Sequence, residues 1–225
     1  MEIIARIHTD LPTKFGLPRQ SGLVEELEGL VVFEPKYREP EALRGIEGFS
    51  HLWLIWEFSE AKRDSWSPTV RPPRLGGNKR MGVFATRSPF RPNPIGLSCV
   101  KLLGVEKTAD QGLALRVGGA DLMDGTPILD IKPYLPLADC RPEATGGFAA
   151  EKAGYSVEVD FPAELLEKVP ESKRTALKAL LAQDPRPAYQ DDPERIYGFG
   201  YAGLEVRFRV AEGRLEVVEV SEDTV

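Results

Sequence analysis

The chain is poor in the residues on which many catalytic and metal sites depend. Its 225 residues include two cysteines and two histidines. Cys99 and Cys140 lack Cys-x-x-Cys spacing, so we expect two free, buried thiols in a reducing compartment. The histidines, His8 and His51, belong to no Ser–His–Asp or Cys–His arrangement that the sequence supports. Nucleophilic catalysis of that kind is therefore not indicated.

Long hydrophobic runs are also missing. No apolar run approaches the roughly 20 residues that a membrane helix requires. The opening residues, MEIIARIHTD, lack the basic and apolar regions of a signal peptide. We therefore expect a soluble, cytoplasmic protein. The glycines of 117–120 (VGGA) do not form Gly-x-Gly-x-x-Gly before a helix, so a Rossmann nucleotide site is disfavoured.

Acidic residues are absent from one segment of an otherwise acidic chain. The formal net charge is -6, from 29 Lys and Arg against 35 Asp and Glu. The segment 65–105 holds seven Lys or Arg and no acid, so it carries +7 and the remainder carries -13. Because local patches decide where a polyanion binds, this segment predicts a surface for an anionic ligand.

The stretch 71–98 (RPPRLGGNKRMGVFATRSPFRPNPIGLS) concentrates six basic side chains, five prolines and four glycines. Prolines fix φ and lower the entropy lost on ordering a loop, so 84–98 should be nearly preformed for a ligand. Arg87 and Arg91 can each hold a carboxylate or phosphate bidentately. The alternative is a rigid structural loop with solvated arginines.

Two further stretches carry chemistry. In 121–134 (DLMDGTPILDIKPY), aspartates at the first, fourth and tenth positions can accept from ribose hydroxyls, an ammonium or a cationic centre. No metal-binding spacing accompanies them, and turn formation is the alternative for Asp124. In 184–189 (DPRPAY), Arg186 and Tyr189 can pair with or stack on a nucleotide, unless the stretch only ends a helix.

Apolar alternation predicts a mainly β chain. Strands are expected at 3–7, 29–33, 50–58, 81–86, 94–105, 112–117, 127–131, 155–161, 204–210 and 214–220. A helix is expected over 164–183, interrupted at Pro170. Regular βαβ alternation is absent from the pattern. We expect a mainly antiparallel β-barrel or curled sheet over residues 1–140, followed by a smaller α+β domain over 141–225.

Together these stretches resemble the TsaA/TrmO family. The blocks that carry the resemblance are PRQSGL (18–23), FSHLWLIWEF (49–58), the whole of 71–98, DLMDGTPILDIKPYLP (121–136) and LAQDPRPAY (181–189). The family implies an S-adenosylmethionine-dependent tRNA methyltransferase. Its implied acceptor is the N6 nitrogen of N6-threonylcarbamoyladenosine, beside the anticodon of threonine tRNA. The implied fold is a single-sheeted β-barrel rather than a Rossmann domain, with a C-terminal domain, a homodimeric assembly and no metal.

Carried over by matching positions, the resemblance implies a set of cofactor contacts. They are Pro18, Arg19, Gln20, Ser59, Glu60, Arg87, Leu97, Asp121, Leu122, Met123 and Asp124. At 59–60 this chain departs from the His-Gln often found in relatives, so backbone contacts are the ones expected there. The cofactor's carboxylate, amine, hydroxyls and sulfonium match arginines and an aspartate-rich turn.

The acceptor nitrogen is a poor nucleophile while it keeps its proton, so a group must accept that proton. Asp130, Tyr134 and Asp184 are the candidates, and the substrate's own threonyl carboxylate is a fourth. Contacts to the threonine tRNA are predicted at Arg71, Arg74, Lys79, Arg80, Arg91, Arg186 and Tyr189. Arg80, Arg87 or Arg91 is expected to pair with the threonyl carboxylate.

Two other functions remain open on the sequence alone. The chain can be a non-catalytic RNA-binding module that uses the basic stretch on structured RNA. It can also be an S-adenosylmethionine-dependent methyltransferase that acts on a small molecule or a protein. The acid-free segment favours a nucleic acid substrate.

Overall fold

The computed structural model describes residues 1–61, 65–72, 79–152, 154–186 and 192–223. Its strands are β1 (Ala5–Thr9), β2 (Glu28–Phe33), β3 (His51–Glu57), β4 (Thr69–Val70), β5 (Met81–Gly82), β6 (Ile95–Thr108), β7 (Gly112–Gly118), β8 (Thr126–Pro133), β9 (Glu158–Asp160), β10 (Tyr197–Tyr201), β11 (Leu204–Ala211) and β12 (Arg214–Glu222). Its α-helices are α1 (Pro136–Asp139), α2 (Ala163–Leu166) and α3 (Glu171–Ala182). Short 3₁₀ helices are η1 (Pro35–Tyr37), η2 (Pro40–Leu43), η3 (Ile46–Gly48), η4 (Ser59–Ala61), η6 (Val83–Ala85) and η7 (Gly147–Lys152). The expectation of a mainly β chain is confirmed.

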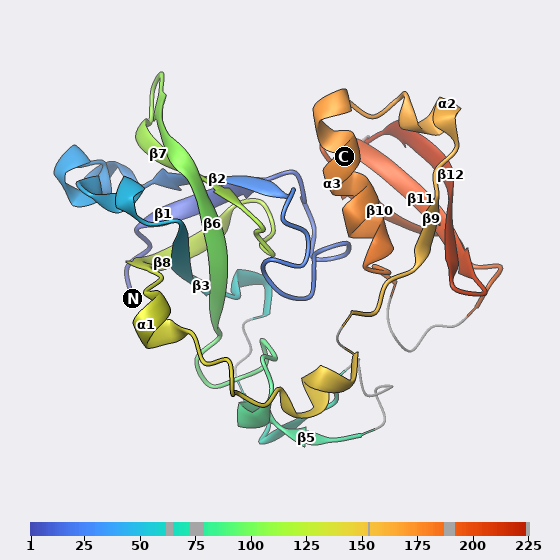
Figure 1. Cartoon of the computed structure of the whole chain (residues 1–225), viewed down its shortest axis with the longest axis horizontal. Helices are drawn as coiled ribbons and strands as arrows, with labels where there is room; N and C mark the ends of the chain where they lie inside the picture. The colour runs from blue at the N-terminus through green and yellow to red at the C-terminus, as the bar shows by residue number, and fades with distance from the viewer. Residues whose placement is uncertain (62–64, 73–78, 153, 187–191, 224–225) are drawn as a thin grey trace.

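Six strands close into a ring in the order β1, β2, β7, β6, β3, β8, and each neighbouring pair is antiparallel (Figure 1). Strand β3 shows how the sequence builds it. Leu52, Leu54 and Trp56 are buried inside the ring, and the residues between them are half-buried on its outside. Successive side chains in a strand point to opposite faces, so this alternation fixes which face lines the core.

The second sheet has the strand order β10, β11, β12, β9, with β9 parallel to β12. Leu177, Leu180 and Leu181 of α3 pack into its buried cluster at the helical spacing that the sequence predicts. Pro170 precedes α3 and separates it from α2, as expected. Figure 1 shows this part in orange and red beside the ring, reached from α1 through η7 along the lower edge of the view.

The segment between β1 and β2 packs with the C-terminal sheet. Leu11, Val24 and Leu27 belong to the same buried cluster as α3 and the C-terminal strands. Phe15 and Leu17 pack against that cluster. In the sequence, residues 10–27 lie between two strands of the ring. Their apolar side chains nevertheless belong to the core of the C-terminal sheet.

Three sequence expectations about local structure are wrong. Residues 81–86 do not form one strand, because the carbonyl of Val83 accepts from both the amide and the hydroxyl of Thr86 and closes a 3₁₀ turn. Cys140 is exposed and Cys99 is half-buried, since Cys99 lies between the inward-facing positions of β6. Strand β10 (YGFGY) escaped prediction because two glycines interrupt its apolar pattern.

None of the helices within the described ranges is long and apolar enough to span a membrane. Among the same residues, no group of three or more His, Cys, Asp or Glu side chains is arranged to hold a metal ion.

Candidate functional site: a cavity at the edge of the ring

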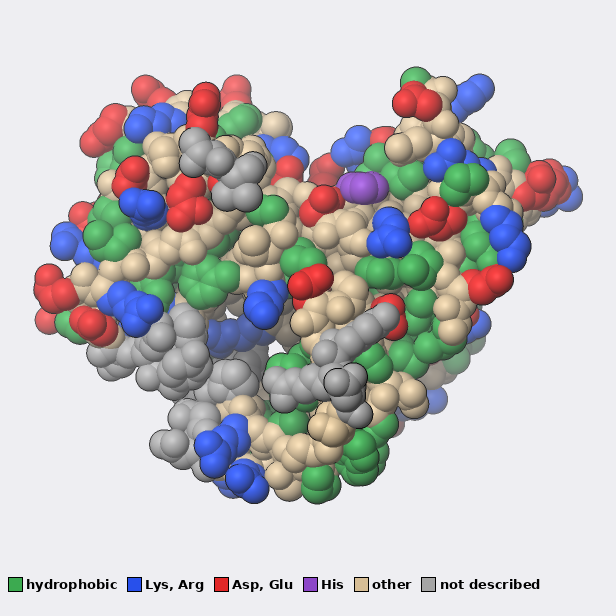
Figure 2. Space-filling view, turned by 180° about the vertical axis from the view of Figure 1, so that it is seen from behind, with side chains coloured by type: hydrophobic (Ala, Val, Ile, Leu, Met, Phe, Trp, Pro, Cys, Tyr) green, Lys and Arg blue, Asp and Glu red, His purple; other side chains and the backbone are tan. Residues whose placement is uncertain are grey.

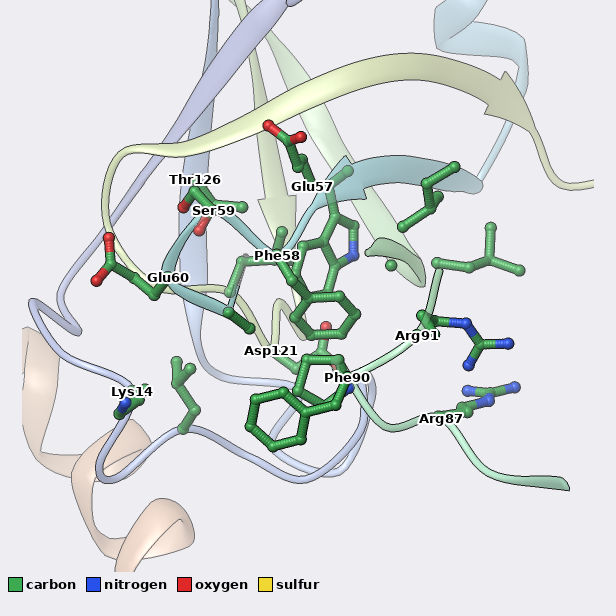
Figure 3. Close-up of a pocket in the computed structure, with 18 of the residues that line it drawn as sticks. Lys14, Glu57, Phe58, Ser59, Glu60, Arg87, Phe90, Arg91, Asp121 and Thr126 are labelled. Carbon is green, nitrogen blue, oxygen red and sulfur yellow. The ribbon is translucent and has the colours of Figure 1, made fainter. Parts of the chain in front are cut away.

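A cavity of about 920 Å³ lies where the end of β3, the start of β6 and the turn before β8 meet the segment that follows β1. That volume lies within the usual range for small-molecule sites. Four stretches line it: 14–20, 56–61, 84–97 and 121–126, each contributing most of its residues. Figure 3 shows their side chains converging from separate elements.

Asp121 is the carboxylate most deeply set in this cavity. Ser98 Oγ donates to Asp121 Oδ1 at 2.5 Å, and Trp56 Nε1 donates to Ser98 Oγ at 2.9 Å. Ser98 is fully buried, so this chain fixes one oxygen of the carboxylate from behind. Burial raises the pKa of Asp121, although hydrogen bonds from Ser98 and from backbone amides, together with the Arg87 charge, oppose the rise.

Arg87 supplies the opposite charge. Its Nη1 donates to Gln20 Oε1, which joins the proline-rich loop to the segment after β1. Arg91 Nη1 donates to the carbonyl of Thr86 at 3.0 Å. In this loop the Thr86 hydroxyl also accepts from the Ser88 amide at 3.2 Å. The loop is therefore held by its own polar contacts, as expected of a preformed surface.

Aromatic rings form part of the wall. Trp56 and Phe58 have ring centroids 4.2 Å apart, and Phe90 lies close to Phe58 in Figure 3. Gly96 is required beside them, because a Cβ there would lie 2.2 Å from Trp56 Cε2. Phe84 lines the mouth and is 72% exposed. The cavity thus offers flat apolar faces beside a carboxylate and a guanidinium.

The structure brings together most of the residues predicted to bind a cofactor. Those that line the cavity are Pro18, Arg19, Gln20, Ser59, Glu60, Arg87, Leu97, Asp121, Leu122 and Met123, joined by Arg91 from the predicted RNA contacts. Whether they contact a cofactor stays a prediction. Sequence reasoning missed Lys14, Trp56, Phe58, Phe84, Phe90 and Thr126. Phe90 had a signal, since it stands among the prolines of SPFRPNP.

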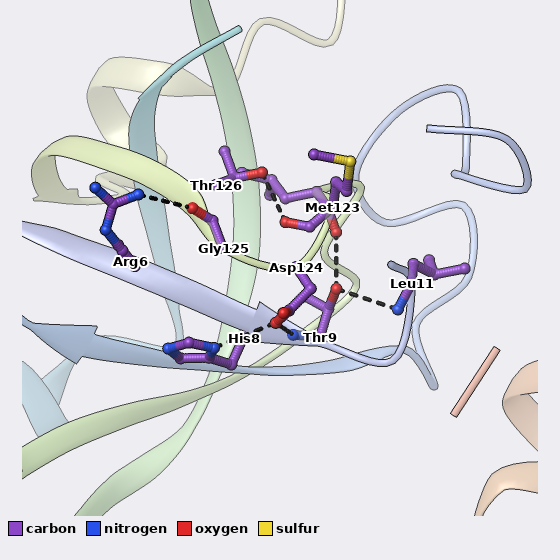
Figure 4. A network of polar contacts seen from close by, with 9 residues as sticks. Arg6, His8, Thr9, Leu11, Met123, Asp124, Gly125 and Thr126 are labelled. Atoms are coloured by element: carbon purple, nitrogen blue, oxygen red, sulfur yellow. Dashed lines mark hydrogen bonds and ion pairs between the residues drawn. The ribbon is translucent and has the colours of Figure 1, made fainter. Parts of the chain in front are cut away.

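Asp124 does not line the cavity. Its Oδ1 accepts from the Thr9 amide at 3.0 Å and lies 3.2 Å from His8 Nδ1 (Figure 4). Its own amide donates to the carbonyl of Leu11. These contacts tie the turn before β8 to the end of β1, which supports the turn-forming alternative for this aspartate.

The three predicted proton acceptors also lie away from the cavity lining. Asp130 pairs with Lys132 at 3.0 Å. Tyr134 donates its amide to the carbonyl of His51, at the far end of β3 from the cavity, about 20 Å along the strand. Asp184 is buried, and its carboxylate accepts from Arg186 and Tyr155. None of the three lines the cavity, and a proton-accepting role for them stays a prediction.

The predicted RNA contacts divide into two groups. The pairing of Val70 with Met81 places Arg71 and Arg80 side by side where the β4–β5 ribbon ends, and both, with Lys79, are exposed. The Arg186 side chain is only 13% exposed and pairs with Asp184. Arg74 and Tyr189 lie outside the described residues.

Fold and cavity together define a mainly β protein with a cavity lined by charged side chains and aromatic rings. The profile described as the tRNA-methyltransferase O N-terminal domain matches residues 6–140, and the TrmO C-terminal domain matches residues 155–223. The chain belongs to the tRNA-methyltransferase O family.

Individual relatives agree with this membership. The chain is 44% identical over 224 residues to the tRNA (adenine(37)-N6)-methyltransferase of Escherichia coli (strain K12), covering 96% of this chain and 95% of the relative. It is 42% identical over 212 residues to a putative S-adenosylmethionine-dependent methyltransferase of Pseudomonas aeruginosa, covering 91% and 90%. A crystal structure of TrmO from Pseudomonas aeruginosa superposes with a TM-score of 0.77 at 33% identity, covering 97% of this chain and 96% of that one.

Proposed function

We propose that this chain is an S-adenosylmethionine-dependent methyltransferase that methylates the N6 nitrogen of adenine 37 in tRNA. The relative from Escherichia coli (strain K12), which matches nearly the whole chain, is named tRNA (adenine(37)-N6)-methyltransferase. The observation that carries the proposal is the cavity itself, which is lined by Asp121, Arg87 and aromatic rings. In S-adenosylmethionine, the carboxylate can pair with an arginine, the ammonium can pair with an aspartate, and the adenine ring can stack on aromatic side chains.

The chemistry needs little more than alignment of two reactants. When bound, the cofactor would supply a methyl carbon activated by a positive sulfur, and transfer to the acceptor nitrogen would break the C–S bond and return its electron pair to sulfur. The cavity's task is to orient the acceptor nitrogen in line with that bond and to exclude water. The displaced N–H proton needs an acceptor, and the carboxylates of Glu57, Glu60 and Asp121 line the cavity. They replace Asp130, Tyr134 and Asp184 as candidates.

We further propose that the acceptor base carries the threonylcarbamoyl group of threonine tRNA. The lining holds Lys14, Arg19, Arg87 and Arg91, more cations than one cofactor carboxylate requires. A second carboxylate, on the threonyl group, would pair with one of them. Arg71, Lys79 and Arg80 at the exposed ribbon would contact phosphates.

The test uses the full-length protein, labelled S-adenosylmethionine and two threonine tRNA preparations, with and without the threonylcarbamoyl group. Nucleoside mass spectrometry should find one added methyl only in the modified tRNA. Equal labelling of both would reject the threonylcarbamoyl requirement. Cofactor binding without any RNA methylation would favour a small-molecule or protein acceptor. Absence of cofactor binding would leave an RNA-binding module.

The division of labour and the assembly are also proposals. We infer a boundary near residue 140 between a cofactor-binding part (1–140) and an RNA-contacting part (141–225), which the two family profiles support. A homodimer is supported by exposed apolar side chains outside the cavity, Leu103 of β6 at 42% and Leu137 of α1 at 99%. Light scattering tests the dimer. A cytoplasmic location, where tRNA is found, and a metal-free reaction complete the proposal.

A further inference from the structure

The loop that lines one wall of the cavity is held from the far side by the C-terminal part. Pro18, Arg19 and Gln20 face the cavity, whereas Phe15 and Leu17 pack on the C-terminal core. Leu17 does both, since it also lines the cavity. The position of this wall therefore depends on contacts that are not in the ring.

Close approaches fix the loop at its beginning. Gly16 has φ +94, and a Cβ there would lie 2.6 Å from Phe199 Cδ2. Asp10 accepts from the amide of Ala202 at 2.9 Å and pairs with Lys173 at 2.5 Å. These contacts hold the stretch before Pro18 against β10 and α3.

Asp184 fixes the loop at its functional end. Arg19 Nη2 donates to the backbone carbonyl of Asp184 at 3.2 Å. Asp184 follows α3 with φ +51, a left-handed conformation that is uncommon for any residue other than glycine. Its side chain is 6% exposed and accepts from Arg186 Nε at 2.9 Å and from the Tyr155 hydroxyl at 3.0 Å.

The carboxylate and the backbone carbonyl of Asp184 have different roles. The carboxylate contacts hold the strained backbone in place, and the backbone carbonyl then meets Arg19. Gln20 Nε2 donates to the carbonyl of Arg19 at 2.5 Å, and Gln20 Oε1 accepts from Arg87 of the proline-rich loop. A continuous series of polar contacts thus runs from Tyr155 and Asp184 to the cation of the candidate cofactor site.

We propose that Asp184 is a positioning residue, which holds Arg19 and the 17–20 wall in the conformation that receives the cofactor. Asp184 touches no reacting atom in this role. The inference rests on the proposed function only in its choice of S-adenosylmethionine as the probe. It also explains why an aspartate inside the predicted RNA-contacting stretch is buried away from the cavity.

The test compares Asp184→Ala, Asp184→Asn and Tyr155→Phe with the matched control Asp160→Asn. Asp160 also pairs with an arginine of the C-terminal part, Arg214, but on its exposed surface. Calorimetry should show cofactor binding weakened about tenfold in Asp184→Ala, as for other residues that orient a ligand-binding group. Asparagine tolerates the left-handed conformation, so Asp184→Asn should recover part of the affinity. Tyr155→Phe should weaken binding about twofold to threefold, and the control should match the wild type.

Hydrogen exchange of the ligand-free proteins gives an independent readout. The amides of Leu17, Arg19 and Gln20 should exchange faster in the Asp184 variants, while those of β3 and β6 should not change. If Asp184→Ala does not fold, the comparison is made with Asp184→Asn and Tyr155→Phe. Unchanged affinity and exchange in variants of a cofactor-binding wild type would overturn the positioning role and leave the proposed function standing. A wild type that binds no cofactor would overturn the proposed function, and exchange alone would then decide the inference.

Discussion

The surface of the C-terminal sheet and the cavity at the edge of the ring arrange their charges in opposite ways. On β11 and β12, Arg207 pairs with Glu219 at 3.2 Å and Arg209 with Glu216 at 2.7 Å. Figure 2 shows acidic and basic side chains interspersed over this part, on the left of the view. At the edge of the ring, Arg87 and Asp121 instead face a common cavity. Charge at the sheet surface is largely neutralised within the protein, whereas charge at the cavity is directed toward a ligand.

The largest effect should come from a substitution that breaks the core beneath the paired surface. Leu181→Ala should lower the free energy of unfolding by about 2–5 kcal/mol, because Leu181 is fully buried. Since the 11–27 segment shares this core, cofactor binding should weaken as well. Denaturant unfolding and calorimetry measure the two effects. Leu137→Ala is the control, since Leu137 is 99% exposed, and a loss of similar size there would show that burial is not the cause.

Asp121→Asn should separate binding from stability. Removing the carboxylate that meets the cofactor's ammonium should weaken binding about hundredfold, the cost of losing one partner of a buried charge pair. The fold should be as stable or more so at neutral pH, because burial disfavours this charge. Asp124→Asn is the matched control, since Asp124 contacts His8 and Thr9 outside the cavity. Equal losses from the two substitutions would contradict the assignment.

Phe90→Ala should cost about tenfold in affinity for whichever ligand places its base against the aromatic wall. The dissociation constant for the cofactor and the KM for tRNA are measured separately. A change confined to the first assigns the wall to the cofactor's adenine, and a change confined to the second assigns it to the acceptor base. Phe90→Leu tests whether a flat ring is needed. If neither constant moves in Phe90→Ala, the wall has no stacking role.

Arg80 at the β4–β5 ribbon and Arg209 of the C-terminal sheet are both exposed, and replacing each tests whether the two surfaces differ in tRNA binding. Arg80→Gln should weaken tRNA binding several-fold and reduce its dependence on salt, because a phosphate contact is lost. Arg209→Gln should leave tRNA binding unchanged and cost less than about 1 kcal/mol of stability, as usual for an exposed ion pair. Filter binding at several salt concentrations distinguishes them. An equal effect of both substitutions would remove the distinction between the two surfaces.

The smallest expected effect is the change with pH of the stability difference between the wild type and Asp121→Asn. Burial raises the pKa of Asp121 in the folded protein above its ordinary value of 3.8. Between these two values the folded state binds more protons than the unfolded state. Asp121 therefore makes stability fall as the pH rises from about 3.8 through the raised pKa, with no further loss above it. The stability gained in Asp121→Asn should thus be larger at about pH 7 than at about pH 4. A difference that does not vary with pH would show that burial of this charge is not its source.

The sequence alone determined the strands of the ring and the stretches that line the cavity. Alternation in β11 and the spacing of leucines in α3 identify their buried faces, because periodicity depends only on local geometry. The long motifs likewise pointed to Arg87 and Asp121. These signals are local, so they survive without knowledge of the fold.

Only the tertiary structure decided which side chains meet. Asp130, Tyr134 and Asp184 had the right chemistry for proton acceptors, yet pairing with Lys132, the register of β3 and the contacts of Arg186 remove them from the cavity. The same holds for the 10–27 segment, whose apolar residues lie in the core of the C-terminal sheet. Residue type determines what a group can do, but contacts between residues more than 150 positions apart, such as Arg19 with Asp184, arise only when the two cores pack.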